Sequence, residues 1–264
     1  MRNEVVCPVF SSHQVGAQMA VTEQRTGTTS LIMLTRDEIH GVRALFDHIP
    51  FHAVDECIAV DGGSTDGTVE FLEQRGLRVV RQSVPGRGLA FLIGAAETKG
   101  DYLVFFSPDG NEDPADIVRL IDLVKQGTDL AIASRFMKGA RNEEDGKIIA
   151  SRKWANLGFT LAFRLLWGGH ITDTQNGFRG VRRARFEEMN LDAQQFEIES
   201  QMTIRALKLK CKVAEIPTRE GDRIGGRSKL PPIPTGLRIL RVMARELLLK
   251  TRFRRQPLSE KPQS

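Results

Sequence analysis

Acidic side chains recur at three places where an apolar run of the chain gives way to a turn. Each group follows a stretch typical of a short β-strand, ending near Leu34, Val60 and Phe106. The three groups are Asp37 and Glu38, then Asp61 and Asp66, then Asp109, Glu112 and Asp113. Ligands of open α/β sheets bind beyond the carboxyl ends of the strands, so carboxylates at this edge suit a cation or the hydroxyls of a sugar or ribose.

Two common nucleotide-binding signatures are missing from the chain. No G-x-G-x-x-G string follows the first predicted strand, and no G-x-x-x-x-G-K-[ST] string occurs. These signatures supply the glycines that let the backbone approach a phosphate closely. The sequence therefore disfavours a dinucleotide-binding domain and excludes a P-loop.

The elements that would position the carboxylates alternate between strand and helix. Short apolar runs predict strands at 30–34, 57–60, 77–81, 102–106 and 130–133. Helices are predicted between them at 37–48, 69–74, 89–97 and 114–125, and later at 151–167, around 204–209 and from 236 to about 253. A last strand is predicted at 212–216. This order favours right-handed βαβ units and a mostly parallel sheet covered on both faces.

Composition and length favour one globular domain with short appendages. The chain has 264 residues, of which 41% are apolar and 27% charged, enough for one well-filled core. We expect a loose leader at 1–28, one α/β domain at 29–230, and at 231–264 a Pro-rich break with a basic helix and tail. The three cysteines lack disulfide or zinc spacing, and neither a signal peptide nor a membrane-spanning run is evident. These features predict a cytoplasmic protein.

The positive charge is concentrated at the C-terminal end. The formal net charge is +5, and the stretch from Gly236 to Ser264 holds eight basic residues against two acidic ones. The rest of the chain is therefore close to neutral. This distribution argues against nucleic acid as a partner of the whole domain.

Eight strings occur in an order that resembles a known family. Those of the first half are Leu-Thr-Arg-Asp-Glu (34–38), Val-Asp-Gly-Gly-Ser-Thr-Asp-Gly-Thr (60–68), Gly-Arg-Gly-Leu-Ala (86–90) and Gly-Asp-Tyr-Leu-Val-Phe-Phe-Ser-Pro-Asp (100–109). Those of the second half are Ala-Ser-Arg-Phe (133–136), Asp-Thr-Gln-Asn-Gly-Phe-Arg (173–179), Glu-Ile-Pro (215–217) and Asp-Arg-Ile-Gly-Gly-Arg-Ser-Lys (222–229). The first set resembles family 2 glycosyltransferases of the GT-A fold. The second resembles, within that family, the polyprenyl-phosphate (dolichyl-phosphate) mannosyl- and glucosyltransferases.

The resemblance implies a fold and a reaction. The fold would be α/β, of the Rossmann-like GT-A type, with a mostly parallel central sheet flanked by helices and a C-terminal amphipathic helix. The reaction would move a sugar from a UDP- or GDP-sugar to a polyprenyl (dolichyl or undecaprenyl) phosphate, with inversion at the anomeric carbon.

The resemblance also assigns the donor side of the site. The residues at the nucleotide would be Thr35, Asp61, Gly86 and Arg87. Asp109 and Asn111 would hold a divalent cation, Mg²⁺ or Mn²⁺. The usual Asp-x-Asp of the family is Ser107-Pro108-Asp109 here, so the first carboxylate is lost. Magnesium tolerates few protein ligands and keeps waters, so one carboxylate with diphosphate oxygens is still compatible with it.

Four basic residues match positions that receive the acceptor phosphate: Arg135, Arg152, Arg223 and Lys229. The catalytic set implied by the resemblance is Asp109, Arg135 and Asp173. A phosphate monoester has a second pKa near ~6, so its oxygen is mostly anionic at neutral pH and needs arginines rather than a strong base. A sugar hydroxyl would instead need a carboxylate base, and Asp173 is the candidate for that role. A non-catalytic subunit that binds nucleotide sugar or lipid is the third alternative, motivated by Ser107.

The C-terminal helix suggests how the chain meets its partners. Arg238, Arg241 and Arg245 recur at helical spacing beside an apolar stripe, namely Leu237, Leu240, Met243, Leu247 and Leu248. Such a helix is typical of docking to a membrane surface, here the cytoplasmic face, and equally of packing on the domain with a solvated basic side. A membrane-anchoring subunit or a homo-oligomer are further partners compatible with the sequence. Trp154 and Trp167 are expected in the core of the long helix at 151–167.

Overall fold

The computed structural model describes residues 26–141, 151–225 and 231–249, without the side chains of 151 and 152. The strands are β1 (Thr29–Thr35), β2 (Glu56–Asp61), β3 (Arg78–Arg81), β4 (Tyr102–Phe106), β5 (Leu130–Ser134), β6 (Arg179–Arg182) and β7 (Val213–Pro217). The α-helices are α1 (Ile39–Leu45), α2 (Thr68–Gln74), α3 (Arg87–Glu97), α4 (Asp116–Lys125), α5 (Ser151–Trp167), α6 (Arg183–Met189), α7 (Ile198–Lys208) and α8 (Pro232–Leu248). Two short 3-10 helices, η1 (Phe46–His48) and η2 (Phe51–Ala53), follow α1.

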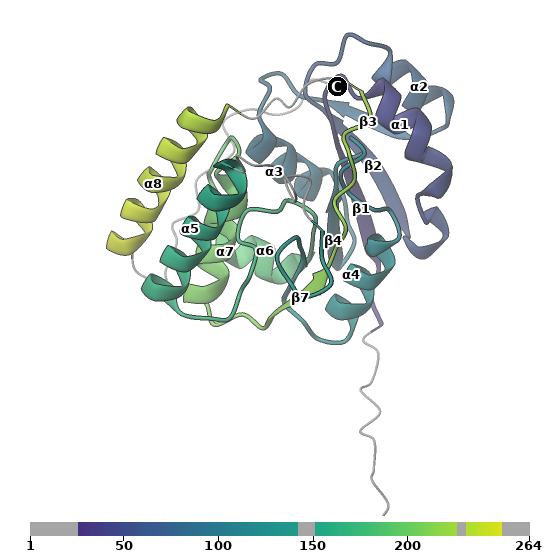
Figure 1. The fold of residues 1–264 in the computed structure, drawn as a ribbon. Coiled ribbons are helices and arrows are strands. Elements are labelled where there is room, and N and C mark those ends of the chain that lie inside the picture. Colours follow the sequence, from purple (N-terminus) through teal and green to yellow (C-terminus); the bar gives the residue numbers. More distant parts are fainter. Residues whose placement is uncertain (1–25, 142–150, 226–230, 250–264) are drawn as a thin grey trace, which may run out of the picture.

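The strands form one seven-stranded sheet with the order β3-β2-β1-β4-β6-β5-β7, and helices flank it (Figure 1). All neighbouring strands are parallel except β6, which runs antiparallel to both β4 and β5. Thr35 at the end of β1 lies in register with Asp61 at the end of β2. The carboxyl ends of β1, β2 and β4 therefore meet at one edge of the sheet, as the sequence predicts.

Each central strand buries side chains on both faces of the sheet. Ile32 and Leu103 belong to the cluster that packs on α3, α6 and α7, whereas Leu31 and Val104 belong to the cluster that packs on α1, α2 and α4. All four side chains have 0% exposure. Continuous apolar strands of this kind need helices on both sides. The expected mostly parallel sheet flanked by helices is confirmed.

A third apolar cluster joins α5, α7 and α8. Phe163 of α5 and Ile204 of α7 pack against Ile239 of α8, together with Val242 and Met243. Arg205 of α7 donates from Nε to Glu246 Oε1 of α8 at 2.8 Å, and both side chains are buried. In Figure 1 the three helices lie side by side at one end of the molecule. The C-terminal helix is thus packed on the domain through one of its faces.

Three features differ from the sequence-based expectations. The antiparallel strand β6 was not predicted, because its Arg-Gly-Val-Arg sequence carries only one apolar side chain. The helix α8 begins at Pro232 rather than at Gly236, because proline is tolerated in the first turn, where its missing N–H costs no intrahelical bond. Trp154 was expected in the core and is 69% exposed, whereas Trp167 packs edge-on against Phe163 at 5.5 Å.

Candidate active site

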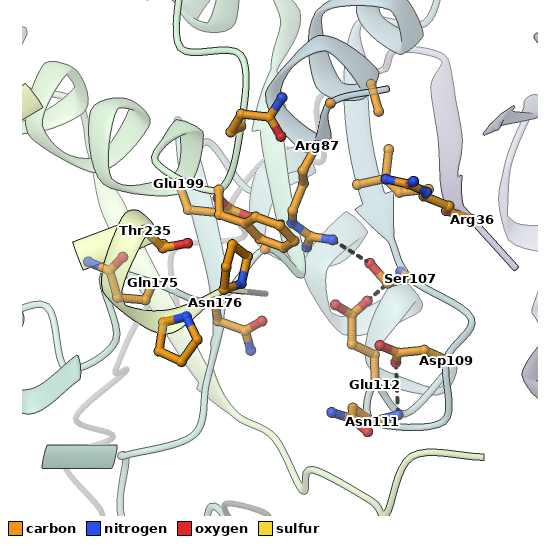
Figure 2. Close-up of a pocket in the computed structure, with 18 of the residues that line it drawn as sticks. Arg36, Arg87, Ser107, Asp109, Asn111, Glu112, Gln175, Asn176, Glu199 and Thr235 are labelled. Carbon is orange, nitrogen blue, oxygen red and sulfur yellow. Dashed lines mark hydrogen bonds and ion pairs between the residues drawn. The ribbon is translucent and has the colours of Figure 1, made fainter. Parts of the chain in front are cut away.

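A pocket of about 630 Å³ opens beyond the carboxyl ends of the strands. Its lining comes from segments far apart in the sequence: the ends of β1 and β4, the start of α3, the loop after β5, the turn before β6, the first turn of α7, the loop after β7 and the first turns of α5 and α8. Figure 2 shows Ser107, Asp109, Asn111 and Glu112 gathered at one side, with Arg87 reaching toward Ser107. The sequence-predicted strand ends therefore converge on one cavity.

Seven of the predicted site residues line this pocket: Thr35, Gly86, Arg87, Asp109, Asn111, Arg135 and Arg223. Asp61 and Asp173 are not among the lining residues, and their side chains are 1% and 0% exposed. The side chain of Arg152, at the start of α5, and the whole of Lys229 lie outside the described residues.

Asp61 fixes the turn after β2 beneath the pocket. Its Oδ1 accepts hydrogen bonds from the backbone N–H of Gly63 and Ser64, at 2.9 and 2.8 Å. Its Oδ2 accepts a hydrogen bond from Thr35 Oγ1 at 3.0 Å, which ties β1 to β2. Thr35 itself reaches the pocket. The pair therefore lies where the sequence predicts the nucleotide, and Thr35 is the member that lines the pocket.

Arg87 lies at the first position of α3 because Gly86 allows the chain to pass close to a neighbouring loop. A Cβ atom at Gly86 would lie 2.5 Å from the carbonyl oxygen of Gln194, so a larger residue would push the loop away. The Arg87 Nε donates to Glu199 Oε1 at 2.5 Å and Nη1 donates to Ser107 Oγ at 3.2 Å. Burial opposes the charge of Arg87, but Glu199 outweighs it and the pKa is raised. The pocket thus contains a firmly charged guanidinium beside Ser107.

The loop after β4 carries the residues predicted for a cation. Asp109 Oδ1 accepts a hydrogen bond from the Asn111 N–H at 3.1 Å, and Oδ2 pairs with Arg223 Nη1 at 2.7 Å. Glu112 Oε2 accepts a hydrogen bond from the Ser107 N–H at 2.6 Å, so this side chain turns inward. Burial and the nearby Asp109 carboxylate raise the pKa of Glu112 to about 8.

These donors fit a hard divalent cation, although the set is smaller than usual. Within the described residues no group of three His, Cys, Asp or Glu side chains converges as a ready-made metal cage. Asp109 and Glu112 nevertheless lie close enough for one to raise the pKa of the other, and a cation relieves such repulsion. Carboxylate and amide oxygens with substrate oxygens suit Mg²⁺ or Mn²⁺. From the sequence, Glu112 could either support the cation site or be a charge in the first turn of the following helix, and its side chain turns inward to the Ser107 N–H.

Asp173 does not lie where a general base could reach a substrate. Its two oxygens accept hydrogen bonds from Arg135, Nε at 2.7 Å and Nη2 at 3.0 Å, and its Oδ1 also accepts the N–H groups of Gln175 and Asn176. Burial raises the pKa of Asp173, but Arg135 outweighs it and the net shift is downward. Asp173 therefore orients Arg135, and its buried carboxylate does not line the pocket.

Arg135 and Arg223 present guanidinium groups to the pocket from two different loops. The Nη1 atom of Arg135 lies 3.5 Å from Glu220 Oε1. Arg223 pairs with both Asp109 and Glu38, which links the loop after β7 to the ends of β4 and β1. Of the predicted acceptor-phosphate residues in the described part of the chain, Arg223 contacts the predicted cation site and Arg135 lines the same pocket.

Glu199 is a charged lining residue that the sequence analysis did not single out. Glu199 sits in the first turn of α7, and its backbone carbonyl oxygen accepts a hydrogen bond from Arg179 Nη1 at 2.9 Å. Arg179 is fully buried and also donates to the carbonyl oxygens of Thr174 and Asn176, so it ties α7 to the turn before β6. Burial lowers the pKa of Arg179 to about 10. No local sequence pattern predicts that Glu199 reaches the pocket, because its partner Arg87 is 112 residues away.

Large apolar side chains are exposed on α5 and α8, the two helices whose first turns also line the pocket. The large apolar side chains exposed on these helices are Trp154, Leu161, Leu165, Leu166, Ile233, Leu237, Leu240, Leu247 and Leu248. Met243, predicted to share their stripe, is buried, and Arg245 pairs with Asp192 at 2.7 Å instead of facing solvent freely. Among the described helices, none is both long enough and apolar enough to cross a membrane.

The profile of the family described as glycosyl transferase family 2 matches residues 30–189. The polyprenol monophosphomannose synthase of Mycolicibacterium smegmatis is 30% identical over 226 residues, covering 79% of this chain and 83% of that protein. Glycosyltransferase AglJ of Haloferax volcanii is 30% identical over 181 residues, covering 68% of this chain and 58% of that protein. The chain thus spans little more than half of AglJ.

The fold also matches solved structures. Glucosyl-3-phosphoglycerate synthase from Mycobacterium tuberculosis, in complex with Mn²⁺ and UDP-glucose, superposes with a TM-score of 0.65 at 22% identity, over 84% of this chain and 80% of that one. At this identity the likeness establishes the fold. The family and the fold expected from the sequence are confirmed: the chain belongs to glycosyl transferase family 2 and has the GT-A fold.

Proposed function

We propose that this chain transfers a sugar from a nucleotide sugar, a UDP- or GDP-sugar, to the phosphate of a polyprenyl lipid, with inversion at the anomeric carbon. The observation that carries this proposal is the convergence of Arg87, Arg135 and Arg223 on one pocket that also holds Asp109. A donor diphosphate and an acceptor phosphate bring several negative charges together, and guanidinium groups are well suited to hold them. The names of relatives that include polyprenol- and dolichol-phosphate mannosyltransferases support the same acceptor class.

The donor end is proposed to run from Thr35 to the loop after β4. Thr35, Gly86 and Arg87 line this part of the pocket, and Asp61 holds Thr35 in place. Asp109, Asn111 and Glu112 would hold Mg²⁺ or Mn²⁺. When bound there, the cation stabilises the negative charge of a departing diphosphate. The Mn²⁺ and UDP-glucose in a structure of the same fold support this arrangement.

The acceptor end is proposed to lie at Arg135 and Arg223. Arg223 has a buried Nε atom that donates to no acceptor among the described residues, so an arriving phosphate would gain that hydrogen bond. Arg135 binds Asp173 through Nε and Nη2, and the residue lines the pocket. Arg152 and Lys229 are proposed to complete this group. A lipid phosphate is mostly anionic at neutral pH and needs no general base. The burial of Asp173 is therefore compatible with a phosphate acceptor.

The membrane surface is proposed to be the place of the reaction. The outward leucines of α8 lie on the same helix as Arg238 and Thr235, which line the pocket. A lipid acceptor would then enter beside the surface that contacts the bilayer. Apolar and basic side chains on one helix suit the interface of an anionic membrane. We propose peripheral attachment at the cytoplasmic face.

A turnover assay tests the proposed function. Purified protein with Mg²⁺ or Mn²⁺ receives UDP-glucose, UDP-N-acetylglucosamine or GDP-mannose with a short polyprenyl phosphate. The matched control is the corresponding polyprenol, which has the same chain and a hydroxyl in place of the phosphate. Nucleotide release and glycolipid formed only with the phosphate support the proposal. Transfer to the polyprenol, or to other hydroxyl acceptors alone, would refute it.

A further inference from the structure

Glu199 has one carboxylate oxygen with a partner and one without. Its Oε1 accepts a hydrogen bond from Arg87 Nε at 2.5 Å. Its Oε2 is buried and accepts no hydrogen bond from any described residue. The side chain is 3% exposed, yet the residue lines the pocket (Figure 2). A buried charged acceptor without a donor is unfavourable, so this oxygen is ready to receive a ligand hydrogen.

The surroundings hold the carboxylate in this position. A Cβ atom at Gly177 would lie 2.8 Å from Glu199 Oε1 and even closer to the Arg87 guanidinium, so only glycine leaves room for the pair. Arg179 Nη1 donates a hydrogen bond to the backbone carbonyl oxygen of Glu199 and so holds the first turn of α7 in place. The side chain therefore cannot turn away to find another donor without breaking the ion pair with Arg87.

The chemistry of the site selects the ligand group. A carboxylate accepts hydrogen bonds and repels phosphate, so Glu199 Oε2 suits a hydroxyl rather than an anion. Arg87 connects Glu199 to Ser107, beside the residues proposed for the diphosphate. In a nucleotide sugar the sugar follows the diphosphate, so its hydroxyls would come next to Glu199. Thr235, whose Oγ1 is also buried without a partner among the described residues, lines the same pocket.

We infer that Glu199 binds a hydroxyl of the donor sugar and is a specificity-determining residue of the enzyme. This inference rests on the proposed function for the identity of the donor. It assigns the sugar end of the pocket to the first turn of α7, whereas the nucleotide end lies at β1 and α3.

The neighbouring Glu197 offers a matched control. It too has a buried Oε2 without a partner among the described residues, and it is 8% exposed. It does not belong to the pocket lining. Changing it to glutamine removes the same charge from the same helix end, away from the proposed sugar.

The test compares donor binding with binding of the nucleoside diphosphate alone. Calorimetry measures UDP-glucose and UDP, or GDP-mannose and GDP, against wild type, Glu199→Gln and Glu197→Gln. Glutamine keeps an oxygen for Arg87 and places an amide NH2 group where Oε2 was, so the acceptor for a hydroxyl is lost. We expect Glu199→Gln to bind the nucleotide sugar about 10- to 100-fold more weakly and the diphosphate unchanged, as befits a hydrogen bond to a charged group. Glu197→Gln should bind both as wild type does. Equal losses for sugar and diphosphate, or no loss, would overturn the inference.

A second measurement needs only the wild-type chain and so does not depend on the variant folding. Analogues of the bound donor that lack one sugar hydroxyl are titrated in turn. At least one should bind about tenfold or more weakly than the parent. If every analogue binds as the parent does, or if wild type binds no nucleotide sugar, the inference is wrong. Because these titrations report donor binding, a chain that binds donors but makes no glycolipid refutes the proposed acceptor and not the role of Glu199.

Discussion

Replacing Asp173 by asparagine should destabilise the fold. The carboxylate has 0% exposure and accepts two hydrogen bonds from the Arg135 guanidinium, at 2.7 and 3.0 Å. Removing one partner of a buried ion pair costs about 3–5 kcal/mol, because the other charge stays buried without compensation. The Arg135 side chain is 14% exposed and lines the pocket, so its charge would not be completely buried without Asp173. We therefore expect the lower end of the range, about 3 kcal/mol.

Urea denaturation followed by circular dichroism measures this loss. A double-mutant cycle with Arg135→Gln should give a coupling free energy of about 2 kcal/mol or more, since the two side chains contact each other directly. The matched control is Asp47→Asn. Asp47 also pairs with an arginine, Arg75 at 2.9 Å, but it is 75% exposed. Exposed pairs contribute at most about 1 kcal/mol, so the control should lose little stability.

The dependence of stability on pH provides a second test of the pair between Asp173 and Arg135. The pKa of Asp173 is lowered from 3.8 in the folded chain, because Arg135 outweighs the effect of burial. A lowered folded-state pKa adds stability above the unfolded value of 3.8, and that stability is lost as the pH falls through the folded value. Wild type should lose stability below about pH 4, and Asp173→Asn should lose less over the same interval.

A different outcome would refute the reasoning about Asp173. If Asp173→Asn keeps wild-type stability while kcat falls and loses its dependence on acidic pH, then Asp173 acts as a base. The chain would in that case resemble enzymes that use a hydroxyl acceptor. The stability measurement and the pH–rate profile thus separate a positioning residue from a proton acceptor.

Three further predictions concern the cation, the membrane and a thiol. Asp109→Asn should weaken Mn²⁺ binding, measured by electron paramagnetic resonance, by at least about tenfold. Asp113→Asn, whose Oδ1 accepts the Ala115 N–H, should leave Mn²⁺ binding unchanged, and equal effects of the two changes would remove Asp109 from the cation site. Exchanging Leu240 and Leu248 for serine should reduce co-sedimentation with anionic liposomes by about tenfold and leave the melting temperature unchanged. If the variant binds liposomes as wild type does, the exposed face of α8 has another role. Burial raises the pKa of Cys57 to about 12, so the native chain should not react with a disulfide reagent at pH 8 at this thiol until urea unfolds it.

The fold was largely predictable because its strands are marked by composition. The runs at Leu31 and Leu103 are apolar without interruption, which is typical of strands covered on both faces, and the helices between them were predictable from their spacing. The strand at Arg179 could not be predicted, since its arginine is buried through hydrogen bonds to the turn before it and to α7, which lies far along the chain. Likewise, Trp154 was misplaced because α5 has apolar residues on two faces and the sequence does not tell which face meets the domain.

The site was predictable where it follows strand ends and unpredictable where it depends on distant pairs. The ends of β1 and β2 and the loop after β4 bring Thr35, Asp61 and Asp109 to one edge, as parallel topology requires. The motif suggested a chemical role for Asp173, but its burial is decided by Arg135, 38 residues earlier. Sequence patterns thus identify which residues reach the pocket edge, whereas ion pairs between separate elements decide which of them remain available to a substrate.

Three arginine–carboxylate pairs hold the pocket together and differ in what they leave available. The pairs are Arg87 with Glu199, Arg135 with Asp173, and Arg223 with Asp109. In the first two, the Nε atom of the arginine binds a carboxylate that is at least 97% buried, so the guanidinium orientation is fixed. In the third, the Nε atom has no acceptor among the described residues, and the Asp109 side chain is 17% exposed. Because both Nη atoms of Arg223 are paired, with Asp109 and Glu38, and its Nε atom is not, we expect Arg223 to gain a hydrogen bond to an incoming phosphate that the other two arginines cannot gain at Nε.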